Sequence, residues 1–205
     1  MCHYQCSGKL IIDVMKRLLI ALLFMMGSSV YAQEWVLKTN LFYDATTTMN
    51  LGFETRLSPK WTLDVSANWN PWSFSDNRKW KQLSFQPEAR YWFCESFNGH
   101  FLGAHLLGGI YNMGNWNTDF TFLGTDFGQL QDYRFEGWML GAGIAYGYQW
   151  LLSKHWSVEA EIGIGYVYSR YDKYECPHCG DLLEENKPHN YFGPTKAAIN
   201  LIYVF

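Results

Sequence analysis

The chain has 205 residues, of which 48% are apolar, 17% are charged and 19% are aromatic, and its formal net charge is −3. This apolar fraction excludes general disorder, and a slightly negative charge excludes the basic surface that nucleic-acid binding needs. The longest clearly apolar run is Leu18–Met26, far shorter than the roughly 20 residues of a membrane-spanning helix. The composition therefore predicts an all-β protein rich in glycine and aromatic residues.

Residues 1–32 are predicted to be a signal region that lies outside the fold. Met15, Lys16 and Arg17 form a basic start, Leu18–Met26 is the apolar segment, and Ala32 ends a stretch of small residues typical of a cleavage site. Residues 1–14 come before a complete signal peptide and indicate an over-extended gene start. We expect residues 15–32 to be cleaved and residues 33–205 to form one domain.

Alternating apolar and polar residues run through the rest of the chain, which is the signature of half-buried strands. The pattern predicts eight strands and no helix, with the strands at about 35–44, 50–57, 61–69, 83–93, 100–111, 138–149, 156–168 and 196–205. Short turns are expected at 58–60, 94–99 and 151–155. Long polar loops are expected at 70–82, 112–135 and 172–194, and 44–48 is the one short connection on that side. Short turns on one side and long loops on the other are typical of outer-membrane barrels.

Alternation alone does not say which face points outward, because a soluble barrel buries its apolar face and a membrane barrel turns it toward lipid. Large aromatic residues gather at the strand ends, as in the interfacial girdles of membrane barrels. One predicted level holds Trp35, Trp61, Tyr91, Trp150, Trp156 and Tyr203, and the other holds Tyr43, Trp69, Trp138, Tyr166 and Tyr168. These observations favour an eight-stranded antiparallel up-and-down transmembrane β-barrel of the outer-membrane type.

The polar face carries charges of both signs among glycine, serine and asparagine. Buried charges must be paired, and the lumen of an eight-stranded barrel is just wide enough for side chains to fill. The sequence therefore predicts an ionic network in the lumen made of Lys38, Glu54, Arg56, Asp64, Glu88, Arg90, Glu159, Glu161 and Lys196.

Cys176 and Cys179 enclose Pro177 and His178 in the last predicted long loop. A local disulfide that pins the loop is the favoured interpretation in an oxidising compartment. A zinc site with His189 and either His178 or Asp181 is an alternative, as is a thioredoxin-like redox pair. The redox mechanism needs a helix start beside the thiols, which the pattern does not predict.

Aromatic residues also lie among small polar residues in the predicted loops, a mixture typical of binding surfaces for proteins and sugars. They can equally pack on one another. The candidates for loop interaction are Trp72, Trp80, Trp116, Phe120, Phe122 and Tyr133.

Several segments resemble a domain-of-unknown-function family of small outer-membrane barrels from Bacteroidota, often encoded near fimbrial genes. The resemblance is carried by Lys38–Asp44, Trp61–Val65, Asn70–Trp72, Glu88–Trp92 and Asn98–Phe101. At fold level the chain also resembles the OmpA-type transmembrane barrel. The resemblance implies a location in the cell outer membrane, contact with outer-membrane lipid, and a surface or fimbrial protein or a glycan as possible partner. A last strand ending in Phe205 resembles the signal that the barrel assembly machinery recognises.

We expect a non-enzymatic outer-membrane barrel, without a cofactor, whose extracellular loops serve structural or surface-interaction roles. Three alternatives remain: a narrow channel, an outer-membrane lipid-modifying enzyme, and a soluble secreted ligand-binding barrel.

Overall fold

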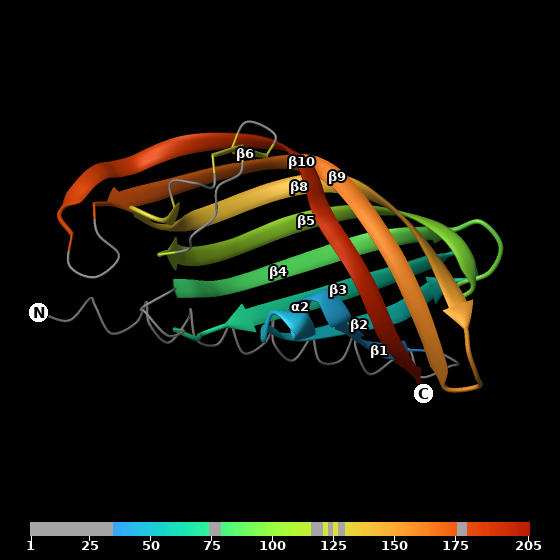
Figure 1. The fold of residues 1–205 in the computed structure, drawn as a ribbon. Coiled ribbons are helices and arrows are strands. Elements are labelled where there is room, and N and C mark those ends of the chain that lie inside the picture. The colour runs from blue at the N-terminus through green and yellow to red at the C-terminus, as the bar shows by residue number, and fades with distance from the viewer. Residues whose placement is uncertain (1–34, 74–78, 116–120, 123–124, 127–129, 176–179) are drawn as a thin grey trace, which may run out of the picture. The chain divides into compact units, whose positions relative to one another are not determined.

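The computed structural model describes residues 35–73, 79–115, 121–122, 125–126, 130–175 and 180–205 (Figure 1). The chain divides into two compact units, Met1–Gln33 and Glu34–Phe205. The first unit lies outside the described residues, so the signal region stays a prediction. Among the described residues, no helix is long and apolar enough to cross a membrane.

The second unit consists of antiparallel strands and one short helix. Eight strands pair in a closed barrel in the order β1-β10-β9-β8-β5-β4-β3-β2, and β6 and β7 form a separate two-stranded sheet. This confirms the prediction of an all-β fold with eight antiparallel strands in one closed sheet. The elements are β1 (Trp35–Asn40), α2 (Leu41–Ala45), β2 (Met49–Ser58), β3 (Trp61–Asn70), β4 (Lys79–Trp92), β5 (Gly99–Gly114), β6 (Thr121–Phe122), β7 (Thr125–Asp126), β8 (Arg134–Leu151), β9 (Trp156–Tyr174) and β10 (Leu182–Val204).

The polar face of each strand points into the barrel and the apolar face points out. In β9, Ser157, Glu159 and Glu161 are buried, whereas Ile162 and Ile164 are exposed. The same division holds around the ring, where the exposed side chains include Leu51, Phe53, Leu63, Leu83, Phe85, Leu102, Leu106, Ile110, Leu140, Ile144 and Ile199. Buried polar residues thus lie on the inward face of the strands, and large apolar residues lie on the outward face.

Aromatic side chains border this outer apolar surface at the end of the barrel that carries the short turns. Trp61 packs against Tyr91 with ring centroids 5.2 Å apart, and Trp156 packs against Tyr203 at the same separation. Trp35 stacks on Phe205 at 3.8 Å. Toward the opposite end, Trp69, Trp138 and Tyr166 are exposed, and Trp138 lies 5.8 Å from Tyr168.

Strands β8, β9 and β10 are much longer than β1, β2 and β3, so one side of the barrel wall extends farther (Figure 1). The prediction of a loop over 172–194 is wrong, because Leu182–Pro194 of β10 pair with Tyr174–Ile164 of β9. Polar residues on both faces and the breakers Pro188 and Pro194 conceal this strand in the sequence. Both prolines are tolerated because this half of β10 pairs with β9 alone, and β1 pairs only with Asn200–Val204.

The first strand is shorter than predicted, and a helix follows it where none was expected. The Asn40 side chain accepts a hydrogen bond from the Phe42 N–H at 3.1 Å, which caps α2 and stops β1. A second bond joins Asn40 Nδ2 to the Ala197 carbonyl of β10 at 3.3 Å. Tyr43 therefore lies in α2 and faces the interior cavity described below, and its predicted place in an outer aromatic girdle is wrong.

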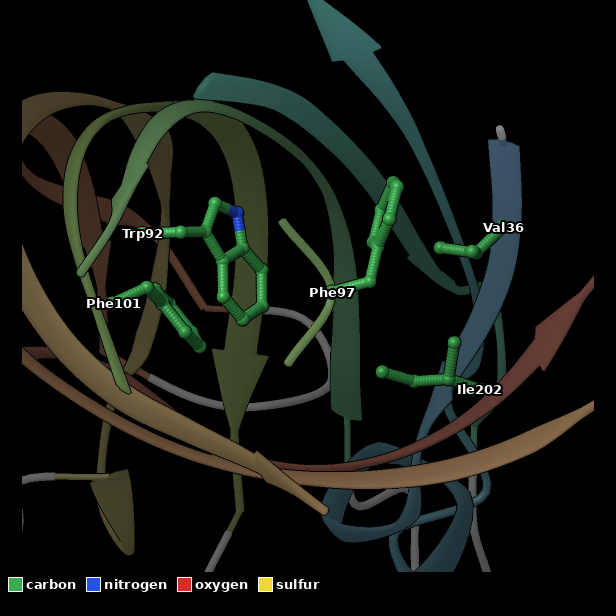
Figure 2. Close-up of a cluster of buried hydrophobic side chains, with 5 residues drawn as sticks. All are labelled: Val36, Trp92, Phe97, Phe101 and Ile202. Atoms are coloured by element: carbon green, nitrogen blue, oxygen red, sulfur yellow. The ribbon is translucent and has the colours of Figure 1, made fainter. Parts of the chain in front are cut away.

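A cluster of apolar side chains fills the barrel interior near the short turns (Figure 2). Trp92 and Phe101 pack with centroids 4.7 Å apart, and Phe97 reaches Trp92 from the turn between β4 and β5. The indole N–H of Trp92 donates to Thr62 Oγ1 at 2.9 Å, so its one polar atom is satisfied. The apolar plug, as we call this cluster, consists of Val36, Trp92, Phe97, Phe101 and Ile202.

Candidate functional site

Arg90 lies at the centre of a buried charge cluster directly beside the apolar plug. Its guanidinium Nε donates to Glu88 at 2.6 Å, and Nη1 donates to Glu54 at 3.0 Å and to Glu159 at 2.8 Å. Nη2 donates to Glu161 at 2.8 Å. The guanidinium carbon also lies 4.4 Å from the ring centroid of Phe101, which connects the cluster to the plug. A planar guanidinium presents donors in several directions, which suits one cation among several carboxylates.

Two lysines complete the pairing on either side of Arg90. Lys38 of β1 pairs with Glu54 and lies 3.3 Å from Glu159. Lys196 of β10 lies 2.7 Å from Glu88 and 3.2 Å from Glu161. Such mutual pairing offsets part of the large cost of burying charge. The interior charge cluster, a name kept below, consists of Lys38, Glu54, Asp64, Glu88, Arg90, Glu159, Glu161 and Lys196.

The structure thus brings together eight of the nine residues expected in a lumen network. Arg56 is placed differently, since its guanidinium carbon lies 5.5 Å from the ring centroid of Phe97. It shares the inward face of β2 with Glu54 but lies two residues nearer the short turns. That step moves it from the level of the charges toward the level of the plug.

Glycine makes room for this cluster on the neighbouring strand β5, where Gly103 pairs with Arg90. A Cβ atom added to Gly103 of β5 would lie 2.5 Å from Glu88 Oε1 and 2.6 Å from Glu88 Cδ. Glu88 cannot swing aside without leaving Arg90 and Lys196. Small residues on the inward face are therefore part of the cluster's geometry.

On the other side of the charge cluster from the plug, the interior holds a cavity of about 470 Å³. Lys38, Asp64 and Lys196 of the cluster form part of its wall. Helix α2 contributes Tyr43, and the bulge of β10 contributes Thr195. Side-chain amides supply much of the remaining polar lining, from Asn40, Asn50, Asn68, Gln82, Gln86 and Asn200.

The predicted loop aromatics lie in several different places. Trp72 is exposed, and its indole N–H donates to the Thr47 carbonyl at 2.9 Å, which ties the β3–β4 connection to the end of α2. Trp80 belongs to β4 and lines the cavity, so its assignment to a loop is wrong. Tyr133 lies just before β8, and the Lys173 ammonium is 3.8 Å from its ring centroid.

The other loop candidates fall wholly or partly outside the described residues. Trp116, Phe120, Cys176 and Cys179 are not among them, and Phe122 is described only by its backbone in β6. The loop disulfide therefore stays a prediction. Within the described ranges, Cys94 has a free thiol and no group of three or more His, Cys, Asp and Glu side chains could hold a metal ion.

The sequence analysis predicted neither the plug nor the cavity, although the sequence does contain a pattern that indicates the plug. Val36, Trp92 and Ile202 stand on the polar face of their strands and break its pattern. All three lie at the short-turn end, and large apolar residues at one level of a polar lumen indicate a closed end. The cavity had no such signal, because it depends on where β1 stops and α2 begins.

A model of one protein family, described as Protein of unknown function (DUF3575), matches residues 18–205. A search of curated proteins found no match, and a search of solved structures found none either.

Proposed function

The chain belongs to the family described as Protein of unknown function (DUF3575), and from that premise we propose that it is a small outer-membrane barrel without enzymatic activity. In this proposal the signal region directs the chain out of the cytoplasm and is removed. The barrel sits in the outer membrane, surrounded by lipid, and presents its long-loop end for structural or surface-interaction roles. A surface or fimbrial protein or a glycan is the proposed partner.

The observation that carries the proposal is the distribution of polarity across the barrel wall. Charges are buried at the centre, and the outer surface exposes a continuous set of large apolar side chains. Soluble monomers seldom expose contiguous apolar patches larger than a few hundred Å². Lipid is the surrounding that such a surface fits best.

The height of the apolar surface also supports the proposal. On β9 it extends from Trp156 to Tyr168, which is about 30 Å along the barrel axis at the usual strand rise and tilt. The apolar band of outer-membrane barrels is about 25 Å high. Beyond it, β9 and β10 carry Arg170, Asp172, Glu185 and Lys187, which suit water.

The interaction role rests on the end of the barrel that carries the longer connections. There Trp72 is exposed beside α2, and the paired ends of β9 and β10 extend past the apolar band. Leu182 and Leu183 are exposed on this extension among charged residues. An apolar centre with a polar rim is the usual anatomy of a protein interface, and in this proposal these side chains are the anchors for the partner.

Membrane insertion is tested by two matched substitutions, Leu106→Arg in the middle of the apolar surface and Leu183→Arg beyond it. Their side chains are 57% and 47% exposed, so a barrel in water would tolerate both. In a bilayer, arginine near the midplane costs about 2–4 kcal/mol and little outside the apolar band. We expect only Leu106→Arg to reduce the folded fraction recovered in carbonate-washed membranes. Equal recovery of both, or release of the unaltered protein by carbonate, contradicts the proposal.

The interaction role is tested by cross-linking on intact cells, with Trp72→Ala and Leu183→Ser combined and Leu57→Ser at the short-turn end as the control. We expect cross-links to a surface protein or glycan to disappear in the first variant and to persist in the second. Cross-links that persist in both variants contradict this location for the partner site.

A further inference from the structure

We infer that the interior cavity is a binding site for a small uncharged ligand with several hydroxyl groups, the chemistry of a monosaccharide. The inference concerns the barrel interior and does not rest on the proposed function. Three features of the cavity wall carry it: charges that are already paired, amide oxygens left as acceptors, and a strand bulge that holds one of these amides in place.

The charged side chains in the cavity wall already have partners within the protein. Lys38 and Lys196 each pair with two glutamates of the interior charge cluster. The Asp64 carboxylate lies 3.4–3.8 Å from three cations, and its Oδ1 is inaccessible. An ion entering the cavity would lose its hydration without finding a free counter-ion, which is costly. The wall therefore favours an uncharged ligand.

Three buried amide side chains line the cavity, and their nitrogen atoms are used within the protein. Asn68 Nδ2 donates to Ser84 Oγ at 3.1 Å. Gln86 Nε2 donates to the Thr195 carbonyl at 3.3 Å, and Asn200 Nδ2 donates to a carboxylate of the charge cluster at 2.7 Å. Within the described residues, the three amide oxygens accept no hydrogen bond, so they are available to a ligand. Hydroxyl groups match them, because they donate hydrogen bonds without carrying charge.

A bulge in β10 fixes the position of the Gln86 amide. Thr195 is the extra residue of this bulge, between Pro194 and Lys196, which pair with consecutive residues of β9. Its Oγ1 lies 2.8 Å from His105 Nε2, and its carbonyl accepts the bond from Gln86. Bulges commonly re-aim side chains beside functional sites. The Gln86 acceptor is thus held in the wall before a ligand enters, which lowers the entropy cost of binding.

The size and the aromatic part of the wall also suit a sugar. Tyr43 of α2 and Trp80 of β4 line the same cavity, and an aromatic ring offers an apolar face to the C–H groups of a sugar ring. The cavity volume of about 470 Å³ lies within the usual range for small-molecule sites, about 300–1,000 Å³. A monosaccharide fits such a volume together with some water.

The cavity lies in the half of the barrel away from the plug, where the β1–β10 ladder has ended. That ladder stops at Asn40 with Asn200. Phe42 of α2 and Pro194 of β10 lie beyond this point, belong to the cavity lining and are exposed. A hydroxylated group can therefore come from solution as a free sugar or from a neighbouring lipid as a sugar headgroup. The chemistry of the site is the same for both sources, and the experiment separates them.

The test is saturation-transfer NMR on the folded protein in micelles of an amine-oxide detergent, with glucose as the probe. We expect glucose to bind, and we expect glucosamine and glucuronate to bind no more tightly. Tetrahydropyran, the sugar ring without hydroxyl groups, is expected to bind at least about tenfold more weakly. Octyl glucoside that displaces glucose at a lower concentration than methyl glucoside assigns the group to a lipid, and equal displacement assigns it to a free sugar.

Two variants locate the site and leave every member of the charge cluster in place. Gln86→Leu removes one acceptor and is expected to weaken glucose binding about tenfold. Gln131→Leu, the same change at an exposed position, is expected to have no effect. Ser66→Leu fills part of the cavity without changing charge and is expected to abolish binding, with the thermal unfolding midpoint as the check that it folds.

Three results would overturn the assignment. The first is the absence of glucose binding to the unaltered protein. The second is binding of glucosamine or glucuronate at least about tenfold tighter than that of glucose, since charge would then dominate recognition. The third is normal glucose binding by the folded Gln86→Leu and Ser66→Leu variants, which would place the sugar elsewhere.

Discussion

Arg90 pairs with five carboxylates that come from four different strands, and no other side chain of the interior charge cluster reaches so many. The sequence could predict which residues join this cluster, because the strand period of two places residues of one parity on one face. It could not predict the partners. Those depend on the pairing register, such as Asp64 opposite Glu88, which brings two carboxylates side by side and makes a shared cation necessary.

Replacement of Arg90 tests the cluster at this scale. Arg90→Met keeps the volume but leaves Glu54, Glu88 and Glu159 without their guanidinium, and we expect a loss of about 3–5 kcal/mol in the free energy of unfolding. Arg90→Lys is expected to retain only part of this free energy of unfolding, because one ammonium cannot reach all the carboxylates. Urea unfolding in micelles, followed by tryptophan fluorescence, measures both.

The control for this comparison is Lys187→Met, which removes an exposed ion pair with Glu184, 3.6 Å long. Exposed pairs contribute about 0–1 kcal/mol, so a much smaller effect is expected. If Arg90→Met is no more destabilising than this control, then the interior charges do not depend on Arg90 in the way the distances indicate.

At the scale of elements, the sequence predicted strands well wherever one face is apolar and the other polar. It failed for Leu182–Pro194, where both faces are polar and two prolines interrupt the run. That segment is a strand because β9 provides a template of backbone partners, a tertiary effect that local sequence does not carry. It also failed at Leu41–Ala45, where one asparagine cap ends a strand and starts a helix.

The one-sided pairing of β10 predicts uneven protection of its backbone. Residues 182–194 pair only with β9, whereas the facing part of β9, residues 164–174, pairs with both β8 and β10. We expect hydrogen–deuterium exchange in micelles to be clearly faster for 182–194 than for 164–174, because alternate amides of β10 face an open edge. Equal protection of the two segments would mean that this edge is covered.

At the scale of the whole barrel, the interior is closed by two successive barriers. The apolar plug fills the end near the short turns, and the interior charge cluster lies directly beside it, with Arg90 against Phe101. The sequence predicted a filled lumen from the number of strands, but it did not predict the cavity beyond the charges, because that depends on the early end of β1. An ion would have to displace both layers to pass.

We therefore expect no conductance steps from the purified protein in planar bilayers. The double substitution Trp92→Ala and Phe97→Ala removes much of the plug but leaves the ion pairs in place. This variant too is expected to show no conductance steps. Removing both barriers, by adding Arg90→Ala, is the arrangement in which steps should first be seen. Stable steps from the unaltered protein would favour the channel interpretation.

The ladder that joins the first and last strands of the ring has consequences for how the barrel resists force. Five residue pairs, from Val36 with Val204 to Asn40 with Asn200, form this ladder, whereas β9 and β10 share far more. Because β1 and β10 are antiparallel, Trp35 and Val204 stand at the same end, and tension between them would peel the bonds apart one at a time. The barrel can thus have high thermal stability and low mechanical stability at this seam. Thermal unfolding must disrupt the whole closed sheet, whereas force applied between β1 and β10 has to break only a short row of hydrogen bonds.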